Sequence, residues 1–331
     1  MERIAVLASH SFAGSYLVDL ALQQGFEVLG ISRSPHASSG YLPFVKPDGS
    51  FPASYYFQAA DLNKGLEHII TCLSDFQPHY IFDYAGQGMV AESWLDPQQW
   101  FQTNVVAKIG LHQALRKFTF LKKYVRASTP EVYGSCNTAT NEQRAYNPST
   151  PYAVSHAAID LSLKTFVERY QFPAAFTRCA NFYGPGQQLY RIIPRSIVAM
   201  KTGQKIPLHG GGHSIRSFLH ARDAARASLL VAQEGRIGEV YHVASDEYLA
   251  IRQLVTIIAQ RLGVSFDQAV EITEDRPSKD SAYYLDTGKI RSQLGWRPQL
   301  TLEQGLTETI VWVENNLSEL AKKPRDFIYQ P

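Results

Sequence analysis

Cysteine is scarce in this sequence of 331 residues, and only Cys72, Cys136 and Cys179 occur. An odd number of widely separated cysteines argues against a disulfide framework, and without a Cys-x-x-Cys pair a structural zinc site is not expected. We therefore expect a reducing, cytoplasmic location and no metal. Residues 1–7 lack the charged and apolar regions of a signal peptide, and no apolar run is long enough to span a bilayer.

An excess of charge of either sign is also missing. Lysine and arginine number 32, aspartate and glutamate 30, and the net charge is +2. Proteins that bind nucleic acid or anionic membranes usually present a concentrated basic surface, so neither partner is expected here. Apolar material is plentiful, because 45% of the residues are hydrophobic, and this is enough for a substantial core.

Short apolar runs alternate with amphipathic segments through the first half of the chain. We predict strands at residues 3–7, 27–31, 79–82 and 124–127, and helices at 14–24 and 104–116. This alternation predicts βαβ units and a parallel sheet, and the continuously apolar strands indicate helices on both faces. The expected fold class is α/β, with a Rossmann-type doubly wound parallel sheet.

Glycine and proline become frequent after about residue 178, and helical spacing returns at 251–262 and 301–316. We interpret this half as a smaller, irregular α/β lobe that covers the carboxyl edge of the sheet, where open α/β sheets bind their ligands. The predicted division is residues 1–177 and 178–331, with some segments interleaved.

The turn between the first strand and the first helix has only one of the three glycines that a dinucleotide-binding turn uses. Gly14 is present, whereas Ala8 and Ser11 occupy the other two positions. Both are small, so a pyrophosphate could still approach, but a positive φ is harder to adopt without glycine. These residues alone leave open a plain strand-to-helix turn.

Two further positions favour a dinucleotide. NAD sites usually place an acid after the second strand, whereas an arginine suits a 2′-phosphate, so Arg33 favours NADP over NAD. Asp61 and Leu62 follow Phe57 at a place where an acid could contact adenine.

Several motifs in a fixed order resemble the extended short-chain dehydrogenases/reductases. The strongest are STPEVYG at Ser128–Gly134 and PYAVSH at Pro151–His156, which are similar to nucleotide-sugar 4,6-dehydratases and epimerases. Gly30–Arg33 resembles GDP-mannose 4,6-dehydratase, and Leu294–Pro298 resembles dTDP-glucose 4,6-dehydratase. The resemblance covers nearly the whole chain.

The resemblance implies a homodimeric enzyme that acts on a GDP- or dTDP-hexose with NADP, or less readily NAD, as cofactor. Residues 1–177 would mainly bind the dinucleotide, and residues 178–331 the nucleotide sugar. The implied cofactor-binding residues are Ala8, Ser11, Phe12, Ala13, Gly14, Arg33, Asp61, Leu62, Ala85, Gly86, Gln87, Tyr152 and His156. The implied substrate-binding residues are Gln87, Asn181, Arg216 and Arg276.

Tyr152 matches the tyrosine that removes the proton of the sugar 4-hydroxyl in this family. Free tyrosine has a pKa of about 10, and the family acidifies it with a lysine four residues later on the same helix face. Here that position is His156, whose ordinary pKa of about 6.5 supplies no fixed charge. If His156 acts only as a weakened lysine, His156→Lys should raise activity.

Thr129 matches the residue that hydrogen-bonds the sugar O4, and Glu131 matches the base that removes the C5 proton. Between them the family has an acid or a serine, but this chain has Pro130, which cannot donate a proton. The resemblance favours a dehydratase working through a 4-keto intermediate, and without an acid at position 130 either Glu131 serves both steps or the reaction is a different one. A sugar epimerase or reductase, and a binding homologue with impaired catalysis, remain alternatives.

Overall fold

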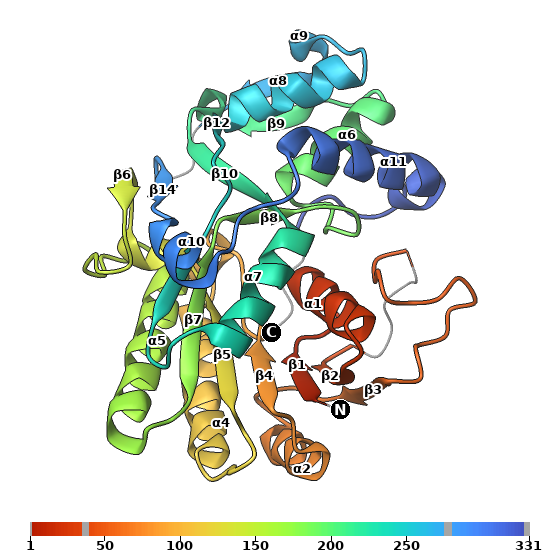
Figure 1. Cartoon of the computed structure of the whole chain (residues 1–331). Coiled ribbons are helices and arrows are strands. Elements are labelled where there is room, and N and C mark those ends of the chain that lie inside the picture. The colour runs from red at the N-terminus through yellow and green to blue at the C-terminus, as the bar shows by residue number, and fades with distance from the viewer. Residues whose placement is uncertain (1, 35–39, 275–279, 328–331) are drawn as a thin grey trace.

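The computed structural model describes residues 2–34, 40–274 and 280–327. Its centre is a seven-stranded parallel sheet with the order β11-β7-β5-β4-β1-β2-β3 (Figure 1). The strands are β1 (Arg3–Leu7), β2 (Glu27–Ser32), β3 (Tyr55–Ala59), β4 (Tyr80–Asp83), β5 (Lys123–Ser128), β7 (Ala174–Cys179) and β11 (Val240–Val243). The strand order reverses direction between β1 and β4, which makes this the switch point of a doubly wound sheet.

Helices cover both faces of the sheet, as the apolar strands predicted. Ile4 and Val6 of β1 pack on one face with α1 (Phe12–Gln23), α7 (Ala221–Glu234) and α10 (Gly288–Leu294). Ala5 and Leu7 point to the other face, toward α2 (Leu66–Phe76), α4 (Ala107–Leu115) and α5 (Pro151–Tyr170). The fold class predicted from the sequence is therefore confirmed.

The remaining elements form a more irregular layer at the carboxyl ends of the strands, at the top of Figure 1. Its helices are α6 (Ile192–Lys201), α8 (Ile251–Arg261), α9 (Phe266–Ala269) and α11 (Leu302–Leu320). Its strands are β8 (Asn181–Tyr183), β9 (Ile206–His209), β10 (Ile215–His220), β12 (Tyr248–Ala250) and β13 (Val270–Thr273), and the pair β6 (Cys136–Thr140) and β14 (Tyr283–Leu285) lies beside them. These helices share an apolar core of their own.

Short helical turns connect these elements: η1 (Glu92–Trp94), α3 (Pro97–Phe101), the π-helical η2 (Gln102–Val106), η3 (Pro130–Tyr133) and η4 (Gly210–Gly212). The four strands predicted in the first half match β1, β2, β4 and β5. The helix predicted at 104–116 is α4, but it is preceded by α3 and by the π turn, which apolar periodicity does not reveal.

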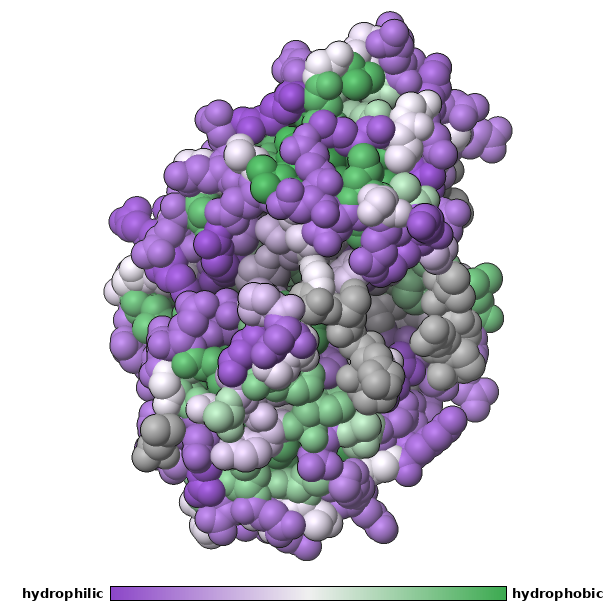
Figure 2. Space-filling view, turned by 90° about the vertical axis from the view of Figure 1, so that its right-hand side faces the viewer, coloured by the Kyte–Doolittle hydropathy of each residue, from purple (hydrophilic) through white to green (hydrophobic). Residues whose placement is uncertain are grey.

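Hydrophilic side chains cover most of the face drawn in Figure 2, and apolar ones appear as separate patches. Among the described residues, no helix has the length and apolar character needed to cross a membrane.

Candidate active site

A cavity of about 1470 Å³ lies between the carboxyl ends of the strands and the irregular layer. Leu7, Ser32, Ser128 and Cys179, the last residues of β1, β2, β5 and β7, all line it. This is the edge at which open α/β sheets bind their ligands. Because one small ligand usually occupies roughly 300–1,000 Å³, the cavity has room for two.

Most of the residues singled out from the sequence line this cavity. They are Ala8, Ser11, Phe12, Ala13, Arg33, Asp61, Leu62, Ala85, Gly86, Gln87, Thr129, Glu131, Tyr152, His156, Asn181 and Arg216. Gly14 lies inside the first turn of α1, behind this lining. Arg276 lies outside the described residues.

The first turn keeps the backbone of a glycine-rich turn with fewer glycines. Ala8 has a φ of 61°, the left-handed conformation that a glycine would adopt there more easily. Ser11 caps α1, since its hydroxyl accepts from the Gly14 amide at 3.1 Å and donates to the Ala8 carbonyl at 2.7 Å. Phe12 and Ala13 begin the helix, so their amides have no carbonyl partner within it and can meet an anion.

Asn104, in the π turn, holds the loop that follows β4. Its side chain accepts from the Gln87 amide at 2.8 Å and donates to the Gln87 carbonyl and the Ser155 hydroxyl, both at 3.1 Å. Gly86 has a φ of 151°, and a Cβ there would lie 2.7 Å from the Asn104 Oδ1. Ser155 in turn donates to the Tyr152 carbonyl at 2.8 Å. The loop, the π turn and the start of α5 are thus fixed to one another.

Tyr152 and His156 project from the first turns of α5. The helix begins here because Thr150 accepts from the Ala153 amide at 3.2 Å and Pro151 occupies the first helical position. Residues four apart share a helix face, and the two rings lie 4.5 Å apart between centroids. The neighbouring tyrosine and histidine predicted from their spacing are therefore in contact.

Thr129 and Glu131 reach the same place from the end of β5. Pro130 begins η3, and the Thr129 hydroxyl accepts from the Glu131 amide at 3.4 Å. Burial, followed by the Glu131 carboxylate, raises the pKa of Tyr152, whereas a hydrogen bond with Thr129 lowers it. Burial also raises the pKa of Glu131 above its ordinary 4.5, and the Arg216 guanidinium opposes this shift.

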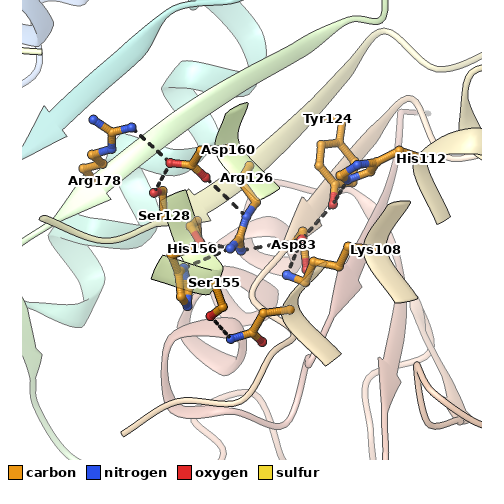
Figure 3. A network of polar contacts seen from close by, with 12 residues as sticks. Asp83, Lys108, His112, Tyr124, Arg126, Ser128, Ser155, His156, Asp160 and Arg178 are labelled. Carbon is orange, nitrogen blue, oxygen red and sulfur yellow. Dashed lines mark hydrogen bonds and ion pairs between the residues drawn. The ribbon is translucent and has the colours of Figure 1, made fainter. Parts of the chain in front are cut away.

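A network of buried charges lies beneath these residues and was missed from the sequence (Figure 3). Its members come from five elements of the sheet and its helices: Asp83 (β4), Lys108 (α4), Arg126 (β5), Asp160 (α5) and Arg178 (β7). All five side chains are at most 1% exposed. The sequence did contain a signal for this network, because Arg126 is a charged residue in the middle of an apolar central strand.

The far side of the cavity is cationic. Arg216 donates to the backbone carbonyls of Ile215 at 2.8 Å and Asp280 at 2.9 Å, and its guanidinium lies 4.4 Å from the centre of the Tyr283 ring. Arg191, which sequence reasoning missed, also lines the cavity and lowers the pKa of Glu131 through its charge. Arginines suit phosphate because their planar fork binds its oxygens in pairs.

These residues fit a nicotinamide dinucleotide. The left-handed Ala8 and the close packing of Gly14 against the Ala8 carbonyl make a compact turn that fits a pyrophosphate at the start of α1, and the same cavity continues to Tyr152 and His156. The fold and this site define a Rossmann-type short-chain dehydrogenase/reductase of the extended class.

Within that class, residues 10–309 match the GDP-mannose 4,6 dehydratase family, and the chain belongs to this family. The chain is 31% identical to the dTDP-glucose 4,6-dehydratase of Salmonella typhimurium over 337 residues, which cover 94% of this chain and 92% of that protein. The resemblance to nucleotide-sugar dehydratases and epimerases found in the sequence is thereby confirmed.

Solved structures agree with this assignment. The dTDP-glucose 4,6-dehydratase of Streptomyces venezuelae, solved with NAD bound, has a TM-score of 0.88 and 29% identity, covering 96% of this chain and 98% of that one. The UDP-glucose 4-epimerase of Thermotoga maritima, solved with UDP-glucose, has a TM-score of 0.85 and 26% identity, covering 95% and 99%. The first of these holds NAD, so a nicotinamide dinucleotide is supported as the class of cofactor but the preference for NADP is not.

Proposed function

We propose that the protein is a nucleotide-sugar 4,6-dehydratase that acts through a 4-keto intermediate. One observation carries this proposal: Thr129, Glu131 and Tyr152 meet in a cavity that also contains the dinucleotide turn. A simple 4-epimerase needs no carboxylate beside the tyrosine, so Glu131 favours elimination.

The chemistry divides among these three side chains. A bound nicotinamide dinucleotide would supply the hydride acceptor for the sugar C4 and the hydride donor for C6. Tyr152 accepts the proton of the 4-hydroxyl, while Thr129 hydrogen-bonds the same oxygen. The 4-ketone acidifies C5–H, and Glu131 takes that proton as the bond from C6 to its hydroxyl breaks. A proton is later added to C5, and the one on Tyr152 is released, so the net loss is one water.

Glu131 takes the place of the missing acid at Pro130. Its carboxyl is buried, which raises its pKa and favours the protonated form once it has taken the C5 proton. The protonated carboxyl can then donate to the departing hydroxyl, which leaves as water. One residue thus acts first as base and then as acid.

The proposed substrate is a nucleoside-diphosphate hexose. The first candidate is dTDP-glucose, because similar proteins are named dTDP-glucose 4,6-dehydratases. Asn181, Arg191 and Arg216 would contact the diphosphate, and Arg276 would join them. Arg33 still favours NADP, although the Streptomyces venezuelae neighbour holds NAD. We propose that residues 1–177 mainly bind the dinucleotide and residues 178–331 mainly the nucleotide sugar, except that α7 and β11 belong to the sheet layer. We also propose that the protein is a homodimer and is located in the cytoplasm.

The test is product analysis by NMR in heavy water. The purified protein is incubated separately with dTDP-glucose, UDP-glucose and GDP-mannose, each with NAD or NADP. A 4-keto-6-deoxy product with deuterium at C5 and the original C4 hydrogen at C6 is expected from one of them. A 4-epimer formed without loss of water would assign the epimerase alternative, and no turnover with any substrate would favour the impaired homologue.

A further inference from the structure

His156 receives a hydrogen bond that fixes its protonation. The Arg126 Nη2 lies 3.0 Å from the His156 Nδ1, at the centre of Figure 3. A guanidinium has only donors, so Nδ1 must accept and its proton must be absent. The ring is therefore neutral with its single proton on Nε2, and burial together with the Arg126 charge lowers its pKa well below 6.5. His156 itself supplies no positive charge to Tyr152.

The buried network beneath His156 does supply a positive charge. It contains three cations, Lys108, Arg126 and Arg178, and two carboxylates, Asp83 and Asp160. With all five ionised, one positive charge is left over. Burying an unbalanced charge is costly. Because this charge lies beside the reaction centre, we expect it to have a function there.

The surplus cation is Arg126. Asp83 is paired with Lys108 at 2.6 Å, and Asp160 with Arg178 at 3.0 Å. Arg126 lies farther from both carboxylates, at 3.6 Å from Asp83 and 3.8 Å from Asp160, beyond good hydrogen-bonding distance. Its Nη1 donates to the Ala127 carbonyl at 2.7 Å, and Nη2 is used for His156.

We infer that Arg126 is a positioning residue that acts through His156. It holds the imidazole as the Nε2–H tautomer against Tyr152 and places the unbalanced positive charge of this five-residue network behind that pair. This inference rests on the proposed function of Tyr152 as a base. The charge favours the phenolate form of Tyr152, because an opposite charge nearby stabilises an anion.

The arrangement changes the expectation for His156→Lys. An ammonium at position 156 would meet the Arg126 guanidinium at close range, and like charges in a buried site repel strongly. The single variant should therefore lose activity. Removing Arg126 as well takes away the like charge that would repel the ammonium. Asp83 and Asp160 stay paired with Lys108 and Arg178 in that double variant.

A charge-relocation experiment tests this. The variants Arg126→Met, His156→Lys and Arg126→Met/His156→Lys are compared for kcat and KM on the nucleotide sugar that the product analysis identifies. We expect each single variant to lower kcat by at least about 30-fold with little change in KM, and the double variant to recover at least about tenfold over either. Lys123→Met is the matched control: Lys123 is a buried cation of the same strand that donates to the Gly235 carbonyl, and its loss should leave kcat unchanged.

A second measurement does not depend on turnover. Protein labelled with ¹⁵N in histidine is studied by NMR, with His156→Gln to assign the resonances. The expected spectrum has an unprotonated Nδ1 and a protonated Nε2 for His156, and Arg126→Met should abolish this fixed tautomer while Lys123→Met keeps it.

The outcomes separate the two ideas. Loss of activity in Arg126→Met without recovery in the double variant, or a protonated Nδ1 in the wild-type spectrum, would overturn the role of Arg126. Absence of turnover in the wild type would overturn the proposed function instead, and the tautomer in Arg126→Met would still show whether the guanidinium positions His156.

Discussion

The Nε of Arg33 lies 3.9 Å from the Oδ2 of Asp61, at the ends of neighbouring strands β2 and β3. The Arg33 side chain is 49% exposed and that of Asp61 26%. An ion pair this long and this exposed contributes little, typically about 0–1 kcal/mol. Arg33 is thus held only weakly and can turn toward the 2′-phosphate of the proposed NADP.

This relationship makes cofactor preference testable. We expect Arg33→Ser to weaken NADP binding by about 10- to 150-fold, because a charge-assisted hydrogen bond contributes about 1.5–3 kcal/mol, and to leave NAD binding nearly unchanged. Titration calorimetry with both dinucleotides measures this. Lys64→Ser, an exposed cation close to Asp61, should change neither affinity. Equal losses for NAD and NADP would contradict a phosphate-binding role for Arg33.

The left-handed Ala8 predicts a stabilising substitution. An L-residue in this conformation costs roughly 1–2 kcal/mol, which glycine avoids apart from its larger loss of entropy on folding. Ala8→Gly should therefore raise the free energy of unfolding by about 1 kcal/mol, measured by urea denaturation. Ala13→Gly removes the same methyl from a helical position of α1 and should lower it by about 1 kcal/mol. A loss of stability in both variants would show that the φ of Ala8 carries no strain.

Glu131→Gln should lower kcat by at least about 100-fold, within the range for loss of a general acid or base. It should also stabilise the protein at high pH. Burial raises the folded-state pKa of Glu131 above 4.5, so its favourable contribution is present below pH 4.5 and is lost as the pH rises through the folded-state pKa. Glutamine does not ionise and avoids that loss.

Urea midpoints of the wild type and Glu131→Gln at pH 4 and pH 8 check the sign. The variant should be the more stable of the two at pH 8, and the difference should shrink toward pH 4. Glu142→Gln provides a control, because burial also raises the pKa of this half-buried carboxyl, which lies in a second, smaller cavity. It should show the same trend in stability with no loss of kcat. A wild type more stable than Glu131→Gln at pH 8 would contradict a raised pKa.

The sequence predicted those features that depend on residues close together along the chain. The strands near residues 3–7 and 124–127 were predictable because their apolar runs are local. The contact between Tyr152 and His156 was predictable because four residues make one helical turn. The capped turn at Ser11 could be located but not its conformation, since Ala8 adopts a positive φ that its residue type disfavours.

The partner of His156 could not be predicted. Arg126 is 30 residues away on another element, and the two meet only through the register of β5 against its neighbours and the packing of α5. The charge count that singles out Arg126 needs Asp83, Asp160 and their cations as well. Long-range pairing of this kind depends on tertiary structure, which a single sequence does not specify residue by residue.

Exposed apolar side chains on α5 and on the segment before α4 predict how the protein associates. Val106 is 56% exposed and Leu161 53%, and Trp94 and Leu95 of the neighbouring η1 region are exposed too. If these helices form the homodimer interface, Leu161→Lys should convert the dimer to a monomer, because burying an unpaired ammonium there is costly. Light scattering after size-exclusion chromatography measures the mass. Ile272→Lys, at a 62% exposed position on β13, should leave the dimer intact. A wild-type monomer would contradict the homodimer, and a dimer unaffected by Leu161→Lys would place the interface elsewhere.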